Sequence, residues 1–155
     1  MNDKEERYKE LVRQLSALIE GEHNSMSVLA NAAAALHNAF KERFFWVGFY
    51  MVSGDELVLG PFQGPVACMR IARGKGVCGT CWVEERTMIV PDVEQFDGHI
   101  ACSSESRSEI VVPIKWGREV AGVIDIDSKS LNDFDRIDAC YLEYIASVIS
   151  RQLYE

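Results

Sequence analysis

The sequence predicts one α+β domain in which an antiparallel sheet lies between N-terminal and C-terminal helices. Helical patterns occupy both ends of the chain, aromatic and β-branched runs occupy its middle, and a two-residue link joins two of those runs. At 155 residues, the chain has the length of a single domain spanning 1–155. A domain of this size buries roughly 68–70% of its unfolded surface, so its cysteines are not needed as disulfide staples.

Two amphipathic helices are expected at the N-terminus. Apolar residues recur at three- and four-residue steps from Asp3 to Glu20, and Gly21 follows as a stop signal. We expect a second helix to be capped by Ser25 or Ser27 and to run to Phe40.

The run from Phe44 to Val52 predicts a strand, with further extended segments expected at 56–60 and 66–71. The two-residue period places Trp46, Gly48 and Tyr50 on one face together with Phe44. That face either lines an apolar pocket, with Gly48 leaving a gap between two aromatic rings, or closes a second core layer.

A β-hairpin is the strongest local signal. Strand patterns at Glu109–Trp116 and Glu119–Asp127 are joined by Gly117-Arg118, which suits a type II′ turn. Asp125 and Asp127 share the face opposite to the isoleucines between and before them. These carboxylates form either a solvated surface or, with Glu109 on the neighbouring strand, a wall that binds a cation or donates a proton.

A last amphipathic helix is expected from Phe134 to about Leu153, capped by Asn132 or Asp133. Cys140 falls on its apolar stripe, which predicts a core thiol outside the chemistry. Such a stripe either pairs two chains as a homodimer or packs on the sheet.

The composition narrows the class of partner and the compartment. A formal net charge of −8 opposes sequence-independent nucleic-acid binding and attraction to an anionic membrane. The chain has no long apolar run, and its N-terminus is charged. We therefore expect a cytoplasmic protein, in which five cysteines indicate thiol catalysis, metal ligation or core packing rather than a permanent disulfide framework.

The stretch from Cys68 to Cys102 holds four of the five cysteines. Cys78-x2-Cys81 followed by His99-x2-Cys102 is close to zinc-ribbon spacing, so a structural zinc site is one alternative. However, the VCGTCW sequence suits the inner face of a helix, and a domain of this size does not need a metal to fold. We expect neither a metal nor a cofactor.

Three segments resemble the free methionine-(R)-sulfoxide reductases, single-domain enzymes of the GAF fold: PFQGPVACMRIARGKGVCGT, VPDVEQFDGHIACSSESRSEIVVPI and GVIDIDS. The resemblance runs from about Trp46 to Phe134 and implies a GAF-like fold. It also implies thiol-dependent reduction of free L-methionine-(R)-sulfoxide, with thioredoxin as the reductant. By this resemblance Cys102 is the nucleophile, Cys68 the resolving cysteine and Cys78 a second resolving or relay cysteine, whereas Cys81 lies outside the triplet.

The same resemblance places the substrate pocket at Trp46, Tyr50, Glu109, Asp125 and Asp127, in agreement with the strand faces above. Carboxylates near a nucleophilic cysteine should suppress its thiolate. We therefore hypothesise that Glu109 or Asp127 is protonated and delivers a proton to the sulfoxide oxygen. The non-enzymatic alternative is a GAF-type small-molecule or redox-sensing module.

Overall fold

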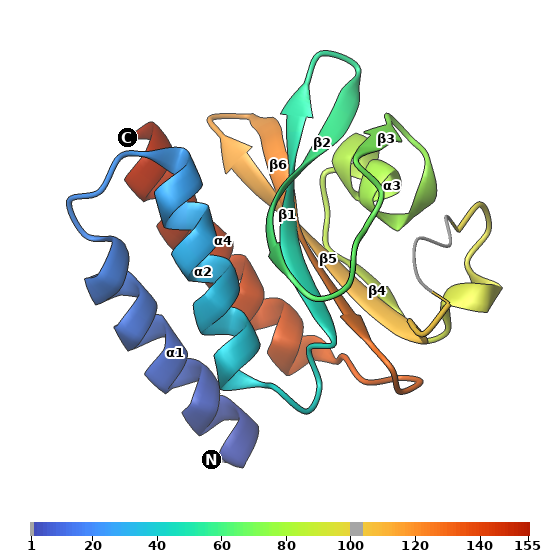
Figure 1. Cartoon of the computed structure of the whole chain (residues 1–155), viewed down its shortest axis with the longest axis horizontal. Helices are drawn as coiled ribbons and strands as arrows, with labels where there is room; N and C mark the ends of the chain where they lie inside the picture. Colours follow the sequence, from blue (N-terminus) through green and yellow to red (C-terminus); the bar gives the residue numbers. More distant parts are fainter. Residues whose placement is uncertain (1, 100–103) are drawn as a thin grey trace.

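The computed structural model describes residues 2–99 and 104–155, so Cys102 lies outside the described residues. Its centre is a six-stranded sheet with the strand order β3-β2-β1-β6-β5-β4 (Figure 1). Every neighbouring pair is antiparallel. The strands are β1 (Trp46–Ser53), β2 (Glu56–Gln63), β3 (Arg70–Ala72), β4 (Met88–Val90), β5 (Ser108–Trp116) and β6 (Glu119–Ser128).

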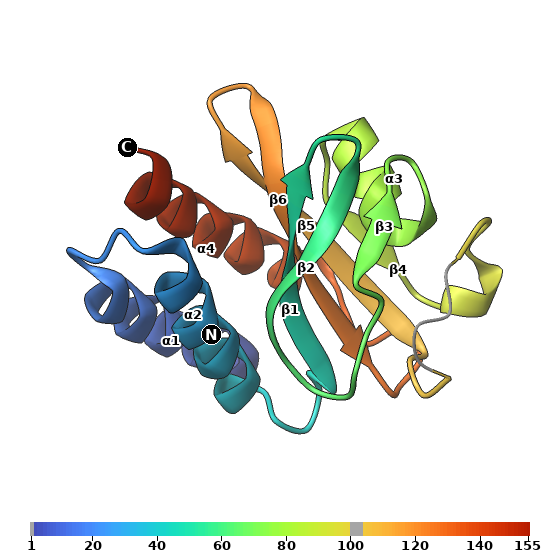
Figure 2. The same cartoon turned by 45° about the horizontal axis from the view of Figure 1, so that its top comes forward.

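The helices divide between the two faces of the sheet. Three long helices, α1 (Asp3–Ile19), α2 (Ser25–Ala39) and α4 (Arg136–Tyr154), lie on one side, and α1 packs on both α2 and α4 (Figures 1 and 2). The short α3 (Gly76–Glu84) covers the other face together with the connections around β3 and the 3₁₀ helix Val93–Gln95. The expected α+β fold with terminal helices packed on an antiparallel sheet is therefore confirmed.

A hydrophobic cluster fills each side of the sheet because side chains alternate along the strands. Val47, Phe49, Ile124 and Ile126 enter the cluster beneath the long helices. Trp46, Tyr50 and Val123 enter the cluster beneath α3. Asp125 and Asp127 share the face of Val123, as the two-residue period predicts, so they point toward α3.

The first strand departs from the predicted alternation at its start. Phe44 joins the cluster beneath the long helices, whereas Phe45 packs on the opposite cluster. The reason is that β1 begins only at Trp46, after a turn that follows α2. The expected gap at Gly48 is also absent, because a Cβ there would lie 2.4 Å from the Cβ of Phe62 and 2.7 Å from the Trp46 ring.

The helix termini are capped one to three residues away from the predicted positions. Asn24, rather than Ser25 or Ser27, caps α2, because its side chain accepts a hydrogen bond from the Ser27 N–H at 3.0 Å. Asp135, rather than Asn132 or Asp133, caps α4 and forms a capping box with Asp138.

The buried stripe of α4 is also rotated from the prediction. Ala139, Leu142, Ile145 and Ile149 face the core, and Cys140 is exposed, so its assignment to the core was wrong. The cause is Asp138, whose fully buried carboxylate accepts hydrogen bonds from Tyr8 and Arg43 and fixes the first turn of the helix.

The hairpin between β5 and β6 agrees with the sequence. Trp116 pairs with Glu119, and Gly117 has φ +65°, as the first central position of a type II′ turn requires. This hairpin sets Glu109 directly opposite Asp127. Among the described residues, none of the helices has the length and apolarity to cross a membrane.

Candidate active site

A small cavity lies between the sheet and α3. Its volume is about 50 Å³, far below the roughly 300–1,000 Å³ of sites for drug-sized ligands. The sheet contributes two aromatic rings and three carboxyl groups to the lining, and α3 contributes Gly76, Val77 and Cys78. His99 and Ser106 complete one side, and Lys75 lies at the exposed end. All the predicted substrate residues, Trp46, Tyr50, Glu109, Asp125 and Asp127, line this one cavity.

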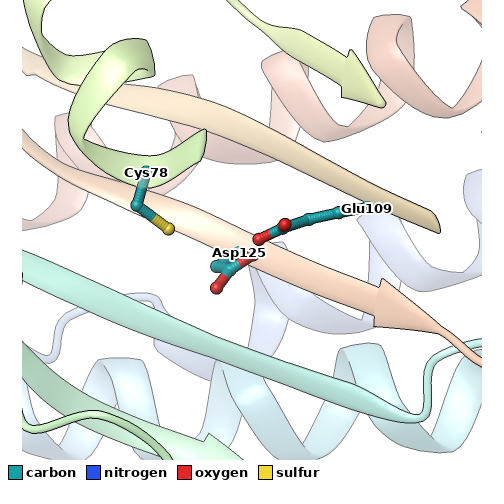
Figure 3. Close-up of side chains that lie close together, drawn as sticks. All are labelled: Cys78, Glu109 and Asp125. Atoms are coloured by element: carbon teal, nitrogen blue, oxygen red, sulfur yellow. The ribbon is translucent and has the colours of Figure 1, made fainter. Parts of the chain in front are cut away.

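The carboxyl groups of Glu109, Asp125 and Asp127 form a coupled cluster. Glu109 and Asp125 are each only 6% exposed, and the side chain of Glu109 makes hydrogen bonds with both aspartates. In Figure 3 the Glu109 carboxyl points toward that of Asp125 from the neighbouring strand. Carboxyl groups in this contact must share protons, because two adjacent buried negative charges are unstable.

Burial raises the pKa of all three carboxyl groups. The pKa of Glu109 lies well above its usual range because of burial and then the charges of Asp125 and Asp127. The pKa of Asp127 is also well raised, by burial and then by the charge of Asp125. Hydrogen bonds from Glu109 and Cys78 oppose the effect of burial on the pKa of Asp125. Asp125 thus accepts hydrogen bonds at the centre of the cluster, and the rise in pKa favours the protonated form most at Glu109 and Asp127.

Two carboxylate oxygens in this cluster are unsatisfied. Ser106 Oγ donates to Asp127 Oδ2 at 3.0 Å. When the carboxyl groups are taken as ionised, the buried Asp125 Oδ1 and Asp127 Oδ1 have no hydrogen-bond partner among the described residues. A buried acceptor without a donor is costly, so either a shared proton or a bound cationic group must satisfy these oxygens.

The aromatic part of the lining lies on the same face of the sheet as the carboxyl groups, since Trp46 on β1 pairs with Asp127 on β6. Trp46 and Tyr50 stack with ring centroids 5.9 Å apart, and Phe62 also stacks with Trp46, at 5.3 Å. Trp46 Nε1 donates to the carbonyl of Pro65 at 3.0 Å. Tyr50 donates to the carbonyl of Cys68 at 2.9 Å, which ties the cysteine-bearing loop to the wall. The Trp46/Tyr50 face therefore both closes a core layer and lines a pocket.

The cysteines occupy different environments. Cys78 is buried on α3 and its side chain hydrogen-bonds Asp125, and burial and the neighbouring carboxylates raise the pKa of its thiol well above the usual range. Cys81 is also buried, and it donates to the Val111 carbonyl at 3.8 Å. Burial raises the pKa of Cys81 to about 12. Cys68 is disulfide-bonded, whereas Cys78, Cys81 and Cys140 are free thiols.

The described residues of the zinc-ribbon pattern, Cys78, Cys81 and His99, do not come together as a set of metal ligands. Among the residues that the structure describes, the only group of three possible metal ligands is Cys78, Glu109 and Asp125, without Cys81 or His99. Cys78 and Cys81 both lie on the inner face of α3, as the helical pattern predicted. Cys102, the fourth residue of the proposed zinc set, lies outside the described residues.

Two lining residues were not expected at the site. Ser106 and Lys75 are placed in the lining by the fold around β5 and α3. The first residues of α3, Gly76, Val77 and Cys78, also line the cavity, and Lys75 makes no side-chain capping bond to this helix. An uncapped helix N-terminus attracts anions.

Comparison with known proteins places this geometry in a family. The GAF domain family matches residues 3–153. GAF domain-containing protein A of Dictyostelium discoideum is 55% identical over 147 residues, covering 94% of this chain and 92% of that relative. The free methionine-R-sulfoxide reductase of Escherichia coli (strain K12) is 41% identical over 151 residues, covering 97% of this chain and 91% of the relative.

A solved structure gives the same result. The X-ray structure of free methionine-R-sulfoxide reductase from Neisseria meningitidis in complex with its substrate superposes with a TM-score of 0.94 at 47% identity, covering 98% of this chain and 91% of that one. The fold and the cavity thus define a GAF-domain protein with a small, carboxyl-lined pocket. At this identity and coverage, the chain belongs to the free methionine-(R)-sulfoxide reductase family of GAF proteins.

Proposed function

We propose that this chain reduces free L-methionine-(R)-sulfoxide to L-methionine by thiol chemistry and is recycled by thioredoxin in the cytoplasm. The observation that supports the proposal most directly is the buried carboxyl cluster beside a stacked aromatic pair in a cavity of about 50 Å³. The E. coli and N. meningitidis relatives described above are named for this activity, and the latter was solved with its substrate.

Each part of the substrate has a chemical counterpart in the cavity. The stacked rings of Trp46 and Tyr50 suit the S-methyl group. The negative charge shared around Asp125 suits the ammonium group, and the uncapped N-terminus of α3 suits the carboxylate. A methionine sulfoxide residue within a peptide has neither free charge, so a small cavity with counterparts for both charges selects the free amino acid.

The proposed chemistry begins at Cys102. Its sulfur attacks the sulfoxide sulfur, the S–O bond breaks as oxygen moves to the cysteine, and the products are methionine and a Cys102 sulfenic acid. The Cys68 thiol then attacks the sulfenic sulfur, forming a disulfide and releasing water. A thioredoxin dithiol reduces that disulfide and is itself oxidised. The disulfide-bonded state of Cys68 is consistent with a resolving role.

We assign proton delivery to Glu109 or Asp127. Burial and the neighbouring charges raise the pKa of each carboxyl and so favour its protonated form, in which either group can hydrogen-bond the sulfoxide oxygen and transfer a proton as the S–O bond breaks. This assignment resolves the conflict between a reactive thiol and neighbouring acids, because protonated carboxyls do not repel a thiolate. Cys78, whose raised pKa disfavours its thiolate, is then a later relay rather than the first resolving group.

The test is methionine formation from the separated R and S epimers of free methionine sulfoxide, with thioredoxin, thioredoxin reductase and NADPH. We expect turnover of the free R epimer alone and none with Cys102→Ser. Cys68→Ser should still give one methionine per chain in a single turnover. A chain that turns over neither epimer but binds the R epimer stoichiometrically would instead be a sensor.

Two isosteric variants test the proton donor. Glu109→Gln and Asp127→Asn should each lower kcat, and the variant that removes the donor should lose about 10²–10⁴-fold. Full turnover in both variants would exclude carboxyl acid catalysis.

A further inference from the structure

Three metal-ligating groups from three different elements converge in the cavity. Cys78 on α3, Glu109 on β5 and Asp125 on β6 each offer one ligand atom, and these atoms all lie within 4.8 Å of one another. Figure 3 shows the Cys78 sulfur and the Glu109 carboxyl both directed toward Asp125. All three residues are buried, so this cluster differs from the exposed acidic groups that are common on protein surfaces.

A second observation indicates that the cluster accommodates a cation. Asp125 is 6% exposed, lines the cavity, and its Oδ1 has no hydrogen-bond partner within residues 2–99 and 104–155 when the carboxyls are ionised. Asp127 Oδ1, on the same cavity wall, is in the same state. Such oxygens can be satisfied by coordination to a cation, just as they can be by a shared proton.

The chemistry of the donor atoms selects the type of metal. Magnesium and calcium prefer ligand sets made only of oxygen, whereas a thiolate favours softer ions such as Zn²⁺. Tetrahedral zinc with bonds of about 2.3 Å to sulfur and 2.0–2.2 Å to oxygen holds its donors ~3.5 Å apart, so the present spacing needs shifts of only about 1 Å. Three protein ligands would leave the fourth position open to water.

We propose that, when Cys78 is reduced, the cavity binds one thiophilic divalent cation of the Zn²⁺ type through Cys78 Sγ, Glu109 and Asp125, and that the bound cation excludes the substrate. Binding displaces the thiol and carboxyl protons into solvent, so no redox change is involved. The ion uses the carboxyl groups that would hold the substrate and is therefore an inhibitor rather than a cofactor. Metal binding does not depend on the proposed function. The exclusion of the substrate by the metal does rest on the proposed function.

The test uses the full chain with Cys68, Cys102 and Cys140 replaced by Ser, which leaves two thiols and cannot turn over. Co²⁺, a spectroscopic substitute for Zn²⁺, should bind at one equivalent with a near-ultraviolet thiolate-to-cobalt charge-transfer band. Adding Cys78→Ser should abolish the band and weaken Zn²⁺ binding by competition titration at least about tenfold. Adding Cys81→Ser, the matched buried thiol on the next turn of α3, should change neither.

Asp125→Asn provides a second variant of nearly equal volume, checked for folding by circular dichroism, and should weaken Zn²⁺ binding while keeping the charge-transfer band. The site would be refuted by absence of the band in the parent protein, or by its loss with Cys81→Ser rather than with Cys78→Ser.

Competition tests the second half of the proposal. Free methionine-(R)-sulfoxide should displace Co²⁺ from the same protein and reduce the band, whereas the S epimer should not. A band unaffected by the R epimer would refute exclusion of the substrate. Metal binding without turnover of either epimer by the metal-free wild-type protein would refute the proposed function and leave the metal site standing.

Discussion

Glu109→Gln should make the protein more stable at neutral pH while lowering its activity. Glu109 is buried between two aspartates, hydrogen-bonds both, and has a pKa well above its usual range. A glutamine amide has two N–H donors, so it can serve both aspartates without carrying an ionisable proton. The substitution therefore removes the titration and keeps the packing.

The magnitude follows from proton linkage. Below the glutamate pKa of the unfolded chain, about 4.3, both states are protonated and the contribution of Glu109 to stability is fully present. As the pH rises above that value, the unfolded chain loses the proton and the folded protein does not. Stability then falls by about 1.4 kcal/mol per pH unit until the pH passes the raised pKa of the folded state. Between pH 5 and pH 7, wild type should therefore lose up to about 3 kcal/mol relative to Glu109→Gln.

Urea unfolding at pH 5, 6 and 7, followed by tryptophan fluorescence, measures this difference. Glu119→Gln is the matched control, because it removes the same charge from an exposed position at the start of β6. The free energy of unfolding of Glu119→Gln should change with pH in the same way as that of wild type. Equal pH slopes for wild type and Glu109→Gln would mean that Glu109 is ionised in the folded protein, which would remove it as a proton donor.

Three further substitutions test the packing around the site and the fold. Cys81→Ser should leave turnover intact, and a loss comparable to that of Cys102→Ser would show that the relay is misassigned. Gly48→Ala should cost about 1–3 kcal/mol in urea unfolding and raise KM, because the new methyl group would lie 2.7 Å from the Trp46 ring. Asp138→Ala should lower the free energy of unfolding by about 3–5 kcal/mol, because it leaves a half-buried guanidinium without its buried partner.

Each of these substitutions has a control or a contrary result. Cys140→Ser, an exposed thiol, gives the baseline for Cys81→Ser. Gly48→Ala with unchanged stability and KM would mean that the aromatic wall is not tightly packed. Asp135→Ala removes the exposed cap of the same helix, together with a surface ion pair to Lys4, and should cost about 1 kcal/mol. An equal loss in Asp138→Ala would contradict the importance of the buried ion pair.

The faces of the central strands were predictable, but the start of the first strand was not. The two-residue period placed Asp125 and Asp127 opposite Ile124 and Ile126, and the structure confirms it. Extended backbone allows no other arrangement once the strand exists. The period failed at Phe44 because that residue belongs to a turn, and no local pattern marks where the turn ends.

Helix orientation was predicted less well than helix existence. The apolar pattern of α4 is broad enough to fit two rotations, and hydrophobicity alone favoured the one that buries Cys140. The structure selects the other because a charged residue, Asp138, is buried by partners from α1 and from the connection that follows α2. A buried charge depends on partners distant in sequence, so a local pattern cannot predict it.

Local patterns predict the order of elements and the hairpin, and the family resemblance predicts the aromatic and carboxyl residues that line one cavity. The meeting of Cys78 on α3 with Glu109 and Asp125 on one face of the sheet, and the burial that raises the pKa of these acids, emerge only from the packed fold. The physical reason is that strand periodicity is local, whereas desolvation and charge coupling depend on every element that covers a group.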